Sequence, residues 1–158
     1  MIAIVKFVHI AALLCWCAAL IALPLLMHHY RGVRIQSRFT EFRLITHFGY
    51  IAFASPAAVV TIGAGTALIF LTDLTDIWLM IKLIFVAGLT LSHAWIGHLI
   101  LRTGETEGRY QMPNPLIALV LAVTQISVIL LLVMAKPDLG WLAGLIPADL
   151  LEPQGGSL

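Results

Sequence analysis

The chain has 158 residues, of which 61% are hydrophobic and 11% are charged, and its formal net charge is +1. Its mean hydropathy is +1.01. Because soluble domains are about 45–50% apolar and about 25% charged, this composition excludes an ordinary soluble domain and indicates a single integral membrane domain. No stretch is both basic and aromatic, so nucleic acid is not an expected partner.

Four apolar windows are long enough for helices that cross a bilayer, which takes about 20 residues. They cover residues 4–27, 47–71, 77–101 and 116–135. We therefore expect an all-α, four-helix membrane bundle within residues 1–136. Residues 137–158 are expected to form a short interfacial segment around GWLAGLI, followed by a flexible tail.

The charges between the windows predict the orientation of the helices. The link between the first two windows has four arginines and one acid, and the link between the second and third has two aspartates and no base. The next link has Arg102 and Arg109. By the positive-inside rule, the first and third links face the cytoplasm and both termini face outward. Trp78 and Trp141 are then expected at the outer interface.

The first two windows contain one imidazole and a series of small side chains. His9 lies roughly 8 Å below the expected outer surface, and Trp16, seven residues later, shares its helix face. In the second window, Thr61 and Gly65 belong to a face on which small residues recur every four positions. Such a face admits either a neighbouring helix or a flat cofactor. Pro56 is expected to kink this helix and to free a carbonyl group.

The third window contains Lys82 and His93, and a lysine at the centre of a span costs about 2.5–3.5 kcal/mol. Eleven residues separate them, which places them within about 20° of each other around a helix. Lys82 has a similar depth to His9, so these two side chains can face each other. Two plainer interpretations remain: the lysine extends to the interface, and the histidine bonds a core carbonyl. His47 and His98, near the cytoplasmic end, are either solvated or form a metal site.

The polar residues favour redox chemistry over hydrolysis. The sequence has no nucleophilic triad, no paired carboxylates within the spans and no zinc-type spacing. Haem iron is readily bound by histidine. Redox chemistry on a bound porphyrin, or electron transfer through one, is therefore the favoured interpretation.

Four motifs carry a resemblance to a known family. KFVHIAALLCW followed by LPLLMHHY, then EFRLI, then WLMIKLIFVAGLTLSHAWIGHLI resemble the HemJ family of protoporphyrinogen IX oxidases, within the wider group of CopD-like membrane proteins. The resemblance covers roughly residues 4–137. It departs from the family pattern at Leu25, at Phe42-Arg43 and at QMPNPL, where the family usually has an arginine, an arginine pair and an acidic segment.

The resemblance implies a haem b-binding oxidoreductase of the bacterial inner membrane that converts protoporphyrinogen IX to protoporphyrin IX. It implies that His9 and Lys82 bind the haem, as ligands of the iron or close partners of it. It also implies catalytic roles for His93, in proton transfer or substrate positioning, and for Arg43, on a substrate propionate. The expected partners are protoporphyrinogen IX, membrane lipid and a quinone or respiratory complex, with a homo-oligomer left open.

Two alternatives remain open from the sequence. The same fold with altered polar positions suits a haem b subunit or an accessory subunit of a respiratory complex. Copper handling of the CopD kind is the second alternative. The five methionines are scattered, whereas soft copper sites combine Met, Cys and His.

Overall fold

The computed structural model describes residues 1–32, 35–72, 77–106, 109–111 and 114–135. Within these ranges four helices are long and apolar enough to cross a membrane: Ile2–His29, Gln36–Thr72, Trp78–Leu101 and Leu116–Met134. The expected all-α four-helix architecture of a multi-pass membrane protein is confirmed. The predicted interfacial segment and tail, including Trp141, lie outside the described residues.

The first, third and fourth windows closely match observed helices. Helix α1 spans Ile2–His29 and is followed by a 3-10 turn, η1, at Tyr30–Gly32. Helices α4 (Ile77–Leu101) and α5 (Leu116–Ala135) begin and end where the sequence predicted. Long apolar runs flanked by polar links therefore determined these boundaries.

The second window predicted only part of its helix. Helix α2 (Gln36–Phe48), the π-helical segment η2 (Gly49–Ala54) and helix α3 (Ser55–Thr72) follow one another without a break. The predicted start at residue 47 was wrong, because hydropathy reports where a helix is apolar and not where it begins. The continuous helix from Gln36 to Thr72 has 37 residues and spans about 56 Å, whereas the hydrocarbon core of a bilayer is roughly 30 Å thick. The polar helix α2 therefore extends beyond the membrane core.

The π-helical segment lies directly before Pro56, where the sequence predicted an irregularity. Proline has no N–H to donate and therefore disturbs the regular bonding of the preceding turn. The Ser55 N–H donates to the carbonyl oxygen of Tyr50, and the Ser55 hydroxyl donates to the same oxygen at 3.0 Å. The extra residue in this turn rotates Tyr50 relative to the face that α3 presents.

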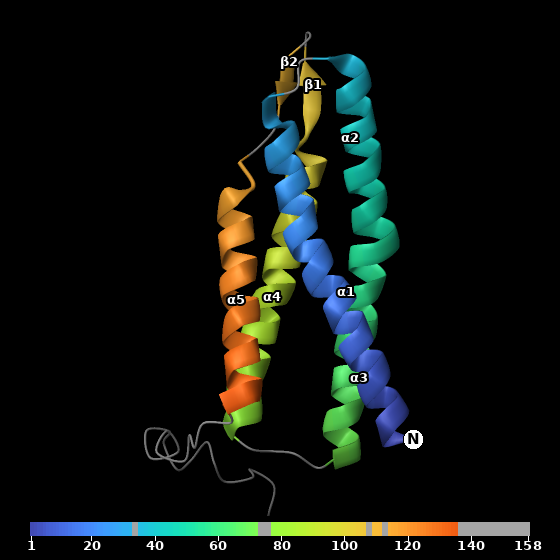
Figure 1. Ribbon diagram of the computed structural model, residues 1–158, viewed down its shortest axis with the longest axis vertical. Helices are drawn as coiled ribbons and strands as arrows, with labels where there is room; N and C mark the ends of the chain where they lie inside the picture. The colour runs from blue at the N-terminus through green and yellow to red at the C-terminus, as the bar shows by residue number, and fades with distance from the viewer. Residues whose placement is uncertain (33–34, 73–76, 107–108, 112–113, 136–158) are drawn as a thin grey trace, which may run out of the picture.

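The helices form two halves that separate towards one end. Helix α1 packs mainly on α3, and α4 packs on α5, whereas α3 and α4 have few contacts although they are consecutive. Figure 1 shows α1 crossing in front of the bundle, with the two halves farthest apart at the end that contains the N terminus. The opposite end carries the start of α2 and a hairpin of β1 (Gly104–Thr106) and β2 (Arg109–Gln111).

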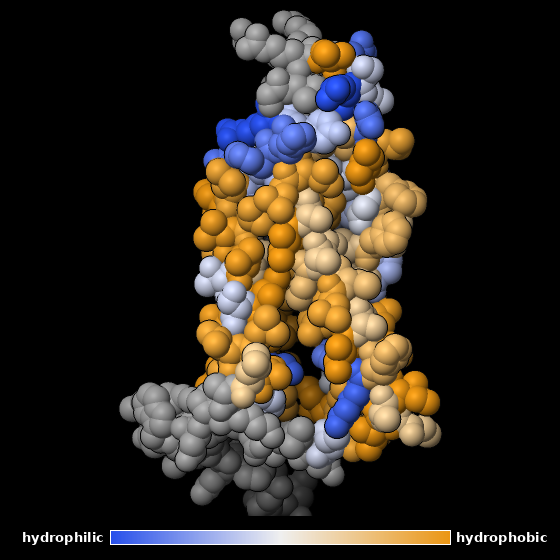
Figure 2. Space-filling view, viewed as in Figure 1, coloured by the Kyte–Doolittle hydropathy of each residue, from blue (hydrophilic) through white to orange (hydrophobic). Residues whose placement is uncertain are grey.

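Most of the buried core lies in the half of the bundle near the hairpin. In the described part of α1 the first buried residue is Trp16, in α4 it is Leu89, and α3 has none after Thr61. Figure 2 shows a hollow between the two halves near the N-terminal end, within a largely apolar surface. The bundle is therefore packed at one end and open at the other. The main core residues are Trp16, Leu20, Leu23, Met27, Phe42, Ala54, Leu89, Ile96, Ala118 and Ala122.

Candidate functional site

A cavity of about 270 Å³ occupies the open end of the bundle, and the empty space including its open side is about 1100 Å³. Helices α1, α3 and α4 form its walls, with one residue of α5. The volume of 270 Å³ is slightly below that of typical small-molecule and cofactor pockets, about 300–1000 Å³, and the cavity is open on one side. The residues that matter most for its chemistry are Lys6, His9, Trp16, Thr61, Gly65, Trp78 and Lys82.

One face of α1 supplies a graded series of side chains to the cavity. Lys6, His9, Leu13 and Trp16 all line it, and their spacing of three, four and three residues places them on one side of a helix. Lys6 is exposed, His9 is half-buried and Trp16 is 0% exposed. The shared face predicted for His9 and Trp16 is therefore confirmed, and Trp16 closes the inner end of the cavity.

His9 is held in one orientation by α3. Its Nδ1 lies 2.9 Å from the backbone carbonyl oxygen of Thr61. Because a carbonyl only accepts, Nδ1 carries the proton, and Nε2 keeps its lone pair. Gly65 gives the ring its space, since a Cβ there would lie 2.9 Å from Cε1 of His9. The predicted small-residue face thus receives the His9 side of α1.

Lys82 lines the same cavity from α4. This matches the expectation that Lys82 and His9 lie at a similar depth and can face each other. Its Nζ lies 5.5 Å from the centre of the Trp78 ring, in range of a cation–π interaction. Trp78 is fixed in turn, because its Nε1 donates to the carbonyl oxygen of Leu132 at 2.6 Å. No carboxylate is among the described lining residues, so the cationic groups of this cavity have no acidic partner there.

His93 does not line the cavity, although Val86 and Leu89 on the stripe that joins it to Lys82 do. The buried ring of Trp16 lies against His93, and its Nε1 donates to Nδ1 of His93 at 3.3 Å. The proton of the neutral imidazole is therefore on Nε2, which lies 3.4 Å from the Ser55 hydroxyl. Both ring nitrogens thus have partners within the protein.

Tyr50 completes this polar cluster in the bundle interior. Its ring stacks on that of His93 with centroids 4.7 Å apart, and its hydroxyl donates to the His93 carbonyl oxygen at 3.3 Å. Gly97 on α4 leaves the space that the phenol occupies, because an added Cβ would overlap the Tyr50 hydroxyl. The π-helical turn that contains Tyr50 is thus locked to α4 around His93.

Arg43 lies far from His9 and Lys82. It lines a separate shallow hollow with Thr40, Leu44 and His47, all on α2. Arg43 precedes Thr61 by 18 residues on the same continuous helix, or about 27 Å along its axis. The structure therefore brings His9 and Lys82 to one cavity, places His93 behind its inner wall and leaves Arg43 near the opposite end.

The histidines expected near the cytoplasmic end, His47 and His98, are not part of a metal cluster in the part of the chain that the structure describes. His47 and His98 are both exposed. No group of three or more His, Cys, Asp or Glu residues that could hold a metal ion is found among the described residues.

Sequence reasoning missed two contributors to the cavity. Lys6 was overlooked, although its three-residue spacing from His9 places it on the same helix face. Trp78 was expected only as an interfacial anchor, whereas its ring also lies beside Lys82.

No protein-family model, curated protein or solved structure matches the chain. The resemblance to the HemJ family therefore depends on the quoted motifs alone.

Proposed function

We propose that this chain is a haem b-binding membrane oxidoreductase that oxidises protoporphyrinogen IX to protoporphyrin IX. The observation that carries the proposal is the position of His9 in the cavity wall, with Nδ1 bonded to the Thr61 carbonyl. Histidines that bind metals almost always donate the other ring N–H to a carbonyl or carboxylate, which fixes the tautomer and orients the ring. Lys82 contributes a second nitrogen from α4 to the same cavity.

The residues present fit a haem. The cavity has largely apolar walls, suited to a flat macrocycle, and it is open on one side. Its basic groups are the His9 imidazole, which has a free lone pair on Nε2, and the amines of Lys6 and Lys82, and histidine is a common haem ligand. When bound, the haem would supply one-electron chemistry that connects substrate oxidation to an acceptor.

The chain's own residues then have distinct tasks. His9 would hold the iron through Nε2, and Lys82, which lines the same cavity, would be a second ligand or a propionate partner. Trp16 closes the inner end and separates the cavity from His93. Since neither His93 nor Arg43 lines the cavity, this proposal assigns neither of them a contact with a porphyrin there.

The proposed reaction also requires an electron acceptor and an orientation in the membrane. Removing six hydrogens from the porphyrinogen takes three two-electron steps, so an acceptor such as a quinone or a respiratory carrier is required. The arginine-rich end, visible as the hydrophilic band in Figure 2, would face the cytoplasm of a bacterial inner membrane. The cavity would then lie in the outer half of the bilayer.

The decisive experiment is an absorption spectrum of detergent-purified protein, oxidised and dithionite-reduced. We expect a reduced b-type band that is lost in His9→Ala and lost or shifted in Lys82→Ala. His98→Ala, which changes an exposed histidine outside the cavity, is the matched control and should keep the band. A wild-type protein that carries no haem when haem supply is ample would refute the proposal.

Two further measurements separate the alternatives. Haem binding without protoporphyrinogen turnover would identify a haem b subunit or an accessory subunit of a respiratory complex. Tight copper binding that disappears in His47→Ala or His98→Ala would instead support copper handling.

A further inference from the structure

The cavity is cationic at one end and apolar at the other. Lys6 lies at the exposed end of the α1 stripe, and Trp16 closes the buried end. On α4, Lys82 lies nearer the open end of the cavity than Val86 and Leu89. A ligand that matches this gradient has an apolar body and at least one anionic group at its edge.

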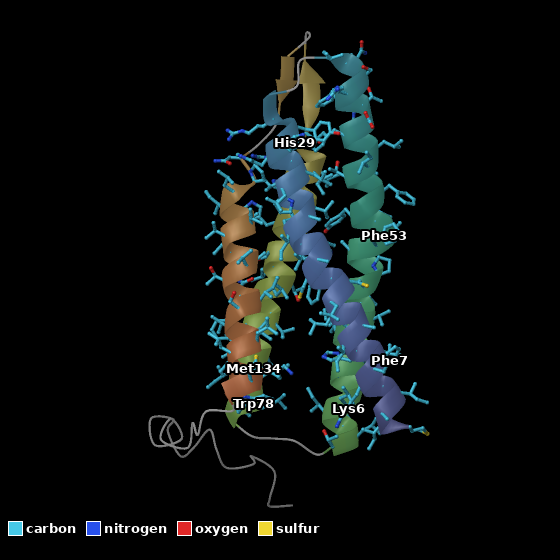
Figure 3. The ribbon with its side chains drawn as sticks, viewed as in Figure 1. Lys6, Phe7, His29, Phe53, Trp78 and Met134 are labelled. Carbon is cyan, nitrogen blue, oxygen red and sulfur yellow. The ribbon has the colours of Figure 1, made fainter. Side chains whose placement is uncertain are left out.

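The open side of the cavity lies on the lateral surface of the bundle, which lipid surrounds in a membrane. Figure 2 shows the hollow opening between the two halves, and Figure 3 places Lys6 on one side of the gap and Trp78 on the other. The outer surface of α1 and α3 at this end of the bundle is strongly apolar, since Phe7 is 72% exposed and Phe70 is 79% exposed. Apolar patches of this kind mark contact with membrane in a protein that spans it.

We infer that Lys6 is a carboxylate anchor at the mouth of this cavity, for an amphipathic ligand that enters sideways from the bilayer. The inference rests on the proposed function, in which the ligand is a porphyrin and the carboxylate is a propionate of the haem or of the porphyrinogen. No described acid lines the cavity, so the Lys6 ammonium group has no partner within the described wall and pairs with the ligand. Neither the sequence motifs nor the resemblance assigns a role to this residue.

Lys6 is well placed for this task without disturbing the haem ligands. It precedes His9 by three residues, so it lies about one helical turn nearer the surface on the same side of α1. Its long side chain can lie along the apolar wall while the charged group stays at the mouth. A charge-assisted hydrogen bond to a carboxylate there should strengthen binding about tenfold or more.

The test compares binding of haemin with binding of its dimethyl ester, which has no carboxylate charge. Wild-type protein in lipid nanodiscs is measured beside Lys6→Gln, Lys6→Arg and Arg102→Gln, the last being an exposed arginine at the opposite end. We expect Lys6→Gln to weaken haemin binding about tenfold and to leave ester binding unchanged. Lys6→Arg should restore the affinity, and Arg102→Gln should have no effect.

The KM for protoporphyrinogen identifies which carboxylate is bound. A raised haemin Kd with an unchanged KM assigns Lys6 to the haem, and the reverse assigns it to the substrate. Equal haemin binding and KM in wild type and Lys6→Gln, or an equal loss for haemin and its ester, overturns the inference. Those results leave the proposed function standing, whereas failure of the wild type to bind any porphyrin refutes that function itself.

Discussion

Gly65→Ala tests whether α3 positions His9. An alanine Cβ would lie 2.9 Å from Cε1 and 3.3 Å from Nδ1 of His9, and the first distance is shorter than real contacts allow. The ring must retreat by about 0.5 Å to reach ordinary packing. Its bond to the Thr61 carbonyl, 2.9 Å long at present, would then lengthen to about 3.4 Å and weaken strongly.

The expected effect is on haem affinity more than on stability. Loss of the bond costs about 0.5–1.5 kcal/mol, and alanine is better than glycine in a helix by a similar amount, roughly 0.5–1 kcal/mol. These contributions nearly cancel in the free energy of unfolding. Loss of a partner that orients a metal-binding histidine typically weakens metal affinity by about 10–100-fold, so we expect the haem Kd of Gly65→Ala to rise within that range.

Gly63→Ala is the matched control, because it lies in the same helix and a Cβ there meets nothing within 4 Å. The assay is titration of apo-protein with haemin, followed by the absorption spectrum, with circular dichroism to confirm equal helix content. Gly63→Ala should bind like the wild type. If Gly65→Ala and Gly63→Ala bind haemin equally well, His9 is not a ligand positioned by α3, and the reasoning fails.

Two further predictions concern the interior of the bundle. His93→Leu leaves the buried Trp16 N–H without an acceptor, so we expect thermal unfolding in detergent to show a loss of about 1–3 kcal/mol in the free energy of unfolding. His93→Asn retains an acceptor and should be less affected. Equal stability of the wild type and His93→Leu would contradict this structural role. Ser92 on α4 donates to the Gln125 side chain on α5 at 2.9 Å. Ser92→Ala should lower the free energy of unfolding, measured by chemical denaturation, by only about 0.6 kcal/mol. A loss of several kcal/mol would contradict this modest role.

The helix boundaries show which features of the fold the hydropathy of the sequence can predict. Windows 77–101 and 116–135 match α4 and α5 because apolar length and helix length coincide there. In the second helix they differ, since the polar stretch from Gln36 to His47 continues the helix beyond the apolar part. Hydropathy cannot detect such an extension, and Arg43 therefore lies on a helix and not in a link.

The candidate site was predicted in part. His9 and Lys82 were expected to face each other because equal depth in neighbouring helices follows from spacing alone, and both line one cavity. His93 was expected on the same stripe as Lys82, and angular position alone could not reveal its separation from the cavity. Trp16, on another helix, lies between His93 and that cavity, so the separation depends on packing.

The sequence by itself determined that this chain is a four-helix membrane protein with polar side chains at defined depths, because apolar length and helical periodicity are local properties. Only the tertiary structure decided which of those side chains share a space. The two halves of the bundle separate at the N-terminal end and pack tightly at the other. The same kinds of residue therefore line a cavity around His9 and form a closed hydrogen-bonded cluster around His93, since helix packing, and not local sequence, sets the distance between segments far apart in the chain.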